Sequence, residues 1–211
     1  MRSFFQCTTI NKLFYSNLIA GITQGIEDGT TYDKQERNMA GIEPNVVNLQ
    51  DPAAHYEKLV TELEVKGQAE ANNAQLLAGD VELTSPTTNF TDSKLTKLDV
   101  HFWSGYTLTS FPDMNRFTTY YFREKGPLPQ GVKWGYCYAS GTDSTARKWV
   151  AAFDSAAGKA YCEAGPTGPV DWNVVEVKLN ASGSSCEYVD PILGGRITAK
   201  ITGLQAISTL Y

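Results

Sequence analysis

The chain has 211 residues, of which 42% are hydrophobic and 11% aromatic, enough apolar material for the core of one large domain or two small ones. Only 19% of the residues are charged, the net charge is -5, and no block of basic residues occurs. This balance argues against binding to nucleic-acid phosphates and against electrostatic attachment to membranes, and no apolar stretch is long enough for a transmembrane helix.

The first part of the chain, residues 1–80, carries the helical signals. Between residues 10 and 26 apolar side chains recur at the spacing of an amphipathic helix, whereas residues 27–50 show no sustained period. Asp51 and Pro52 then mark the start of a second helix, because aspartate is a good N-cap and proline fits the first helical position. We therefore predict a helical arm over residues 1–80.

The N-terminal segment, MRSFFQCTTINKLFYSNLIAG, is a poor match to a secretory signal peptide, because polar residues interrupt any apolar core. Cys7 also lacks the small preceding residues of a lipidation site. These features indicate either a cytoplasmic chain or a chain already in its mature form.

The second part, residues 81–211, has the pattern of short strands separated by turn clusters. Apolar and polar residues alternate most clearly in WNVVEVKLN, where Val175, Val177 and Leu179 face one way. We predict strands at Asp80–Leu83, Lys97–Trp103, Arg116–Arg123, Val132–Ala139, Lys148–Phe153, Lys159–Glu163, Asn173–Leu179 and Gly195–Thr202. The expected fold class is α+β, with the helical arm followed by a β-rich antiparallel meander, sandwich or barrel.

One segment, STARKWVAAFDSAAG at residues 144–158, fits two structures. Its alanines, with Ser144 as an N-cap and Gly158 as a stop, are typical of a helix. The short turns on either side favour a strand followed by a hairpin turn. We predict the strand.

The four cysteines, at positions 7, 137, 162 and 186, lack the spacing of a metal site or a catalytic thiol. They contain no CxxC pair, and the chain has only two histidines, His55 and His101, as further zinc ligands. Cys137 and Cys162 are flanked by aromatic residues, and burial among these raises a thiol pKa, which disfavours a nucleophile. We predict a structural role, as buried thiols or a disulfide, with no metal and no cofactor.

The predicted disulfide depends on how residues 132–163 fold. In a three-stranded meander, Cys137 and Cys162 lie on strands separated by a third, roughly 9 to 10 Å apart, beyond the span of roughly 7 Å that a disulfide permits. Cys186, expected in the turn NASGSSCEY, is then the better partner for Cys162. If residues 144–157 formed a helix instead, Cys137 and Cys162 could pair.

Two N-x-S/T triplets, at Asn89 and Asn180, are candidate glycosylation sites in turn-like surroundings. Together with three cysteines in the β-rich part, they favour an oxidising location, either extracellular or on the surface of a virion or cell. A cytoplasmic location is expected if no disulfide forms.

Known catalytic signatures are missing from the sequence: it has no GxSxG elbow, no Walker A loop, no GxGxxG after a strand and no HExxH. Asp99 and His101 share one face of a predicted strand and are the best candidates for an enzymatic site. The other carboxylates are scattered and are expected at the solvated surface.

Aromatic residues concentrate between residues 102 and 161. A β-sheet core accounts for such a load, and the alternative is an aromatic surface that binds carbohydrate or another subunit. The candidates for that surface are Trp103, Tyr106, Trp134 and Tyr136.

The missing catalytic signatures, the low charge and the Thr/Ser/Gly/Tyr-rich strands favour a non-enzymatic subunit of an extracellular filament, virion or surface assembly. Residues 1–50 would then pack on copies of the chain or on other subunits through apolar side chains such as Phe4, Phe5 and Phe14. One alternative is a secreted carbohydrate- or ligand-binding β-domain that uses its aromatic residues. A second is a small β-barrel enzyme with a site near Asp99 and His101.

Overall fold

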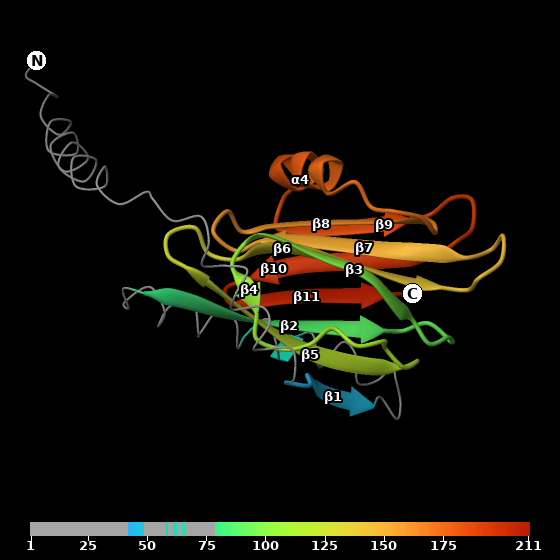
Figure 1. Ribbon diagram of the computed structural model, residues 1–211, viewed down its shortest axis with the longest axis horizontal. Coiled ribbons are helices and arrows are strands. Elements are labelled where there is room, and N and C mark those ends of the chain that lie inside the picture. Colours follow the sequence, from blue (N-terminus) through green and yellow to red (C-terminus); the bar gives the residue numbers. More distant parts are fainter. Residues whose placement is uncertain (1–41, 49–57, 59–60, 63–64, 66–78) are drawn as a thin grey trace, which may run out of the picture. The chain divides into compact units, whose positions relative to one another are not determined.

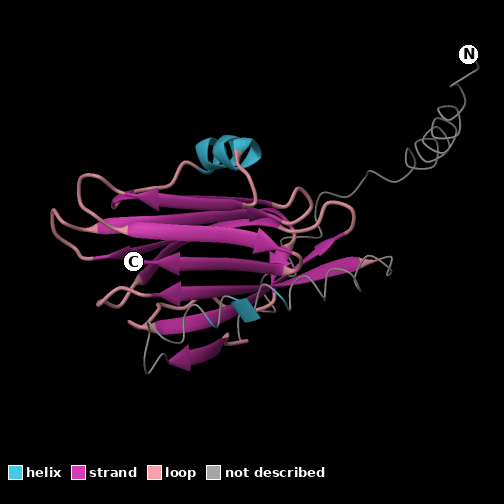
Figure 2. Cartoon of the chain, turned by 180° about the vertical axis from the view of Figure 1, so that it is seen from behind, coloured by secondary structure: helices cyan, strands magenta, loops and turns pink. Residues whose placement is uncertain are grey.

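The computed structural model describes residues 42–48, 58, 61–62, 65 and 79–211. Within the last of these ranges, two β-sheets face each other as a sandwich, and the helix α4 (Trp172–Ala181) lies on the outside of one sheet (Figures 1 and 2). No helix in the described part of the chain is long and apolar enough to cross a membrane.

The larger sheet has seven strands in the order β1–β5–β2–β11–β10–β9, with β4 paired to β5. Neighbouring strands are antiparallel, except that β11 runs parallel to β2. The strands are β1 (Asn45–Asn48), β2 (Asp80–Asn89), β4 (Tyr106–Thr107), β5 (Thr118–Pro127), β9 (Ser185–Val189), β10 (Arg196–Thr202) and β11 (Gln205–Leu210).

The smaller sheet is antiparallel throughout, in the order β3–β6–β7–β8. Its strands are β3 (Thr96–Ser104), β6 (Lys133–Ser140), β7 (Arg147–Asp154) and β8 (Lys159–Pro166). The strand predicted within residues 144–158 is confirmed as β7. The turn after it ends at Gly158, whose φ of 62° is a conformation that favours glycine.

The space between the sheets is filled by side chains that alternate along each strand. On β6, Trp134, Tyr136 and Tyr138 face the larger sheet and are fully buried, whereas Cys137 faces the outside of the sandwich. Burying one large apolar side chain contributes about 1.5 to 3 kcal/mol, so these aromatic residues supply much of the driving force for folding.

The larger sheet also brings polar side chains into this interior. The hydroxyl of Tyr136 hydrogen bonds with Ser208 and, at 3.3 Å, with Thr87. Ser85 donates a hydrogen bond of 2.5 Å to one carboxyl oxygen of Glu124, whose other oxygen has no partner among the described residues. Burial raises the pKa of Glu124 to about 8, and the hydrogen bond from Ser85 only partly offsets it, so the carboxyl is mainly protonated at neutral pH.

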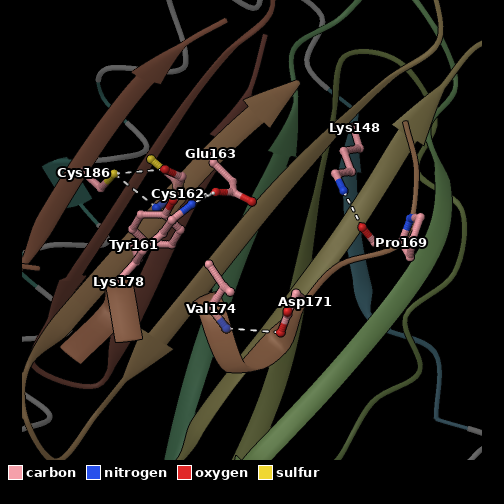
Figure 3. Close-up of polar contacts among 9 residues, drawn as sticks. All are labelled: Lys148, Tyr161, Cys162, Glu163, Pro169, Asp171, Val174, Lys178 and Cys186. Atoms are coloured by element: carbon pink, nitrogen blue, oxygen red, sulfur yellow. Dashed lines mark hydrogen bonds and ion pairs between the residues drawn. The ribbon is translucent and has the colours of Figure 1, made fainter. Parts of the chain in front are cut away.

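Helix α4 is fixed at its start and along one face. The side chain of Asp171 accepts hydrogen bonds from the backbone N–H groups of Asn173 (3.0 Å) and Val174 (3.3 Å; Figure 3), as an N-cap does. Val175 and Leu179 lie one turn apart on the buried face and pack on the outer face of the smaller sheet, against Cys137, Val150 and Ala152.

The predicted fold class was wrong, because the described chain is mostly β and its ten-residue helix occupies a segment predicted as a strand. The alternation of Val175, Val177 and Leu179 suggested that strand. In the structure only Val175 and Leu179 are buried, and Val177 is 68% exposed. Residues four positions apart lie on the same face of a helix and also on the same face of a strand. The pattern of this short segment therefore fitted both structures.

The predicted helical arm over residues 1–80 lies almost entirely outside the described residues. Within it, Lys58, Thr61, Glu62 and Val65 have helical backbone, and Asn45–Asn48 form the strand β1 on β5.

The other seven predicted strands are confirmed with shifted ends, and four strands were missed: β1, β4, β9 and β11. β11 is buried along its whole length, so it lacks the alternation that marks a half-exposed strand. Cys186, expected in a turn, lies on β9.

Candidate functional site

The structure separates the four aromatic residues predicted for a ligand or subunit surface. Trp134 and Tyr136 are fully buried between the sheets and are not accessible in the folded chain. Tyr106 is partly exposed on β4, beside Lys125 of β5. Trp103 is partly exposed on β3, the edge strand of the smaller sheet, and packs against the residues under α4.

Trp103 belongs to a cluster of three aromatic rings on the outer face of the smaller sheet, which we call the aromatic platform: His101, Trp103 and Trp172. The His101 and Trp172 rings are stacked, with centroids 5.4 Å apart and an angle of 12° between planes. Trp103 meets both edge-on, with centroids 4.7 Å from His101 and 5.8 Å from Trp172. These separations are those of favourable aromatic pairs, and all three residues remain partly exposed.

Three neighbours fix the ring of Trp172. The indole N–H donates a hydrogen bond of 2.7 Å to the carboxylate of Asp99 on β3. Asp171 caps the helix that Trp172 begins. Gly135, opposite His101 on β6, leaves room for the ring, because a Cβ there would lie 2.7 Å from a Trp172 ring carbon. The N-cap Asp171 and the missing side chain of Gly135 thus both help to place this tryptophan.

Charged side chains border the platform. The ammonium of Lys133 lies 5.7 Å from the centroid of a Trp103 ring, within cation–π range. The same ammonium donates to Glu176 at 2.6 Å and to the side-chain oxygen of Asn180 at 2.9 Å. Lys133 therefore ties β6 to α4 beside the rings.

An open cavity of about 340 Å³ is lined in part by Asp99, the residue that accepts the hydrogen bond from Trp172. Its other lining residues are Leu98 and the segment 167–170. Lys148 fastens that segment by donating to the carbonyl oxygens of Gly168 (3.1 Å) and Pro169 (2.7 Å; Figure 3). The platform and the cavity thus share one carboxylate.

Asp99 and His101 lie on the same face of β3, as the alternation of that strand predicted. The Asp99 carboxylate accepts hydrogen bonds from the Trp172 indole and from the backbone N–H of Val100 (2.8 Å), whereas His101 contacts its aromatic neighbours. No hydrogen bond or ion pair between Asp99 and His101 is seen among the described contacts.

Cys137 and Cys162 lie on strands separated by a third strand, as the predicted meander implied. Cys137 on β6 lies under α4 and Cys162 on β8 lies in the core between the sheets, with β7 between the two strands. Burial raises the pKa of the Cys137 thiol to about 12. Cys186 lies against Cys162, with its Sγ atom 3.1 Å from the Cys162 backbone nitrogen, and all three thiols are free. A Cys162–Cys186 disulfide stays a prediction.

The two glycosylation candidates have different surroundings. Asn89 is fully buried, and its amide nitrogen donates hydrogen bonds to the carbonyl oxygens of Ser93, Met114 and Asn115 at 2.8 to 3.2 Å. Attaching a glycan to that nitrogen in the folded chain would break this network. Asn180 is exposed in the last turn of α4, and its modification stays a prediction.

Trp172 is the platform residue that the sequence did not reveal, because its segment was predicted as a strand. The signal that could have found it is Asp171, an N-cap residue placed directly before an aromatic residue and a stretch with buried positions four apart.

No family model and no curated protein matches this sequence. Among solved structures, the chain is similar to the lipid-binding protein Nakanori, with a TM-score of 0.49 and 12% identity over 71% of this chain and 78% of that one. It is also similar to the lectin XCL of Xerocomus chrysenteron, with a TM-score of 0.38 and 9% identity over 62% of this chain and 97% of that one. Both TM-scores lie below 0.5, so neither likeness identifies the function of this chain.

Proposed function

We propose that the chain is a ligand-binding β-sandwich that holds a carbohydrate on the aromatic platform. The observation that carries the proposal is the gathering of His101, Trp103 and Trp172 on the outside of the smaller sheet, partly exposed and fixed in position. Trp134 and Tyr136, by contrast, are fully buried in the core.

The chemistry around the rings fits a sugar. A pyranose has an apolar face of C–H groups and an edge of hydroxyl groups, so it needs a flat aromatic surface beside a few hydrogen-bonding groups. A partly exposed ring of the platform would supply the flat surface, since the three rings are not coplanar. Asp99 supplies an acceptor for hydroxyl groups at the point where the rings meet the cavity of about 340 Å³.

The site is also preorganised, because its parts are held by contacts within the protein. Asp99 holds Trp172, and Lys133 and Lys148 hold the helix and the adjoining loop. A binding surface that is already ordered loses less conformational entropy when a ligand arrives.

The assembly hypothesis rested on residues 1–50, of which the structure describes only 42–48. It therefore stays a prediction, and the platform is the feature of the described chain that points to a ligand.

Replacing Trp103 with alanine tests the proposal. We expect wild-type protein to show quenching or enhancement of tryptophan fluorescence with at least one of three probes: cello-, chito- or manno-oligosaccharides. Trp103→Ala should weaken that binding about tenfold or more, as expected for a central aromatic contact. Isothermal titration calorimetry with the responding probe gives the affinity, and near-UV circular dichroism reports the fold.

The matched control is Tyr161→Ala. Tyr161 is also a partly buried ring on the outer face of the smaller sheet, with the ammonium of Lys178 at 5.5 Å from its centroid, but it lies on β8. We expect this variant to bind the probe like the wild type. Equal losses in the two variants, or no binding of any probe to the wild type, would count against a carbohydrate site on the platform.

A further inference from the structure

Two free cysteines lie side by side where the edges of the two sheets meet. Cys162 lies on β8, the edge strand of the smaller sheet, and Cys186 lies on β9, the edge strand of the larger one. The sulfur of Cys186 lies 3.1 Å from the backbone nitrogen of Cys162 and 3.4 Å from its backbone oxygen (Figure 3).

The strand pairing accounts for this meeting. Cys186 is opposite Ala199 of β10, and both side chains point into the sandwich. The sulfur of Cys162 lies 3.6 Å from the carbonyl oxygen of Ile197, two residues earlier on β10. The two thiols therefore share one space bounded by β8, β9 and β10.

The surroundings give the two thiols different reactivity. Hydrogen bonds from the thiol and the backbone N–H of Cys162 favour the thiolate of Cys186 and lower its pKa, although burial and the charges of Glu163 and Glu187 oppose this. The same hydrogen bond and burial raise the pKa of Cys162. Cys186 is partly exposed, whereas Cys162 is 1% exposed.

We propose that Cys186 and Cys162 form a thiol–disulfide redox site, in which Cys186 reacts first with a small hydroperoxide and Cys162 resolves the product into a disulfide. The arrangement of an accessible thiol beside a second, buried thiol is that of redox-responsive cysteines. The inference stands apart from the carbohydrate site, which uses neither residue.

The reaction balances with one hydroperoxide. The Cys186 thiolate attacks one peroxide oxygen, the S–O bond forms as the O–O bond breaks, and the departing alkoxide or hydroxide takes up a proton. The Cys162 sulfur then gives up its proton and attacks the Cys186 sulfur, the S–S bond forms, and the oxygen of the sulfenic acid leaves as water. The two thiols lose two electrons, and the peroxide gains them.

The product is a covalent link between the two sheets. Cys162 and Cys186 are 24 positions apart, and the loop that the disulfide closes contains the whole of α4. Closing a loop in the unfolded chain lowers its entropy, so the oxidised protein should melt at a higher temperature than the reduced protein.

The test uses the full chain with Cys7→Ser, which leaves the three cysteines described here. The native protein is treated with one equivalent of hydrogen peroxide and alkylated with iodoacetamide, and its peptides are mapped by mass spectrometry without reduction. We expect a Cys162–Cys186 cross-link, an unmodified Cys137 thiol before unfolding, and a higher melting temperature that reductant reverses. In the reduced protein, alkylation of Cys186 should begin at a lower pH than that of Cys137 and be at least about tenfold faster at neutral pH.

Two variants assign the roles. In Cys162→Ala the reaction should stop at a sulfenic acid on Cys186, which dimedone traps, and in Cys186→Ser no cross-link should form. Cys137→Ser is the matched control and should behave like the parent. A cross-link that forms only after unfolding, or dimedone labelling that falls on Cys162 or Cys137 in the native parent, would overturn the proposal.

Discussion

The two faces of the smaller sheet both carry aromatic residues and differ in how far they bury them. On the inner face, Trp134 and Tyr136 are fully buried against the larger sheet. On the outer face, His101 and Trp103 remain partly exposed beside Trp172 of α4. The two faces of one sheet therefore differ in whether their rings are buried in the core or remain partly exposed.

The difference follows from the period of the strand. Phe102 packs on the core, whereas His101 and Trp103, on either side of it, point outward. A sheet covered on both faces would bury all three. The ten-residue helix α4 covers only part of the outer face, so the rings at the β3 edge stay accessible.

Replacing Trp134 with alanine gives the largest expected effect of the inner face. The side chain is fully buried, and its removal leaves a cavity, so the free energy of unfolding should fall by about 3 to 5 kcal/mol. Urea denaturation measured by circular dichroism gives the value. Trp134→Phe should cost much less, because the indole nitrogen has no hydrogen-bond partner among the described residues. Equal losses for the two variants would contradict a cavity as the cause.

The buried carboxyl group of Glu124 offers a second test of the inner face, namely whether the interior of the sandwich disfavours a charged side chain. Its pKa is about 8 in the folded chain, against 4.5 as the ordinary value, so between these values the native state holds a proton that the unfolded state releases. Stability should therefore fall as the pH rises, by about 3 kcal/mol between about pH 5 and about pH 7.5. Glu124→Gln should remove most of that slope and be more stable than the wild type at the higher pH.

The measurement is urea denaturation at several pH values. Glu187→Gln is the matched control, because Glu187 is an exposed carboxylate paired with Arg196 at 2.7 Å. Its slope should match that of the wild type. A Glu124→Gln protein whose stability still falls steeply over this pH range would show that Glu124 is not the titrating group.

Much of the sandwich could be predicted from the sequence, since strands with one buried face show alternation. The meander β6–β7–β8 was expected, and with it the separation of Cys137 from Cys162. The strand β11, which is buried along its whole length, was missed. The helix α4 was missed because Val175, Val177 and Leu179 alternate with polar residues, which is the pattern of a strand.

The candidate site was harder to predict than the fold. Trp103 was selected because it is aromatic, but the same criterion selected Trp134 and Tyr136, which the structure buries. Only the pairing of β3 with β6 shows which rings share the outer face, and only the position of α4 brings Trp172 to them. These are long-range contacts, and no local pattern encodes them.

The smallest expected effect concerns the outer face, where Lys178 of α4 donates to Glu163 of β8 at 2.7 Å (Figure 3). Burial alone would raise the pKa of Glu163, but hydrogen bonds from Lys178 and Tyr161 outweigh it and lower the pKa. A carboxylate with a lowered pKa stabilises the fold above its ordinary pKa and loses that effect as the pH falls through its folded value. Both side chains are partly exposed, so Lys178→Gln should cost only about 0.2 to 1 kcal/mol near neutral pH.

Hydrogen exchange locates this effect better than global unfolding does. If the Lys178–Glu163 pair fastens α4 to the sheet, Lys178→Gln should speed exchange at the α4 amides while those of β6 and β7 keep their rates, because local opening draws on local contacts. Arg196→Gln, which breaks an exposed pair with Glu187 on β9 and β10, should leave the α4 rates unchanged. Faster exchange throughout β6 and β7 in Lys178→Gln would mean that the outer face contributes to the stability of the whole sandwich, and the two faces would then not be separable.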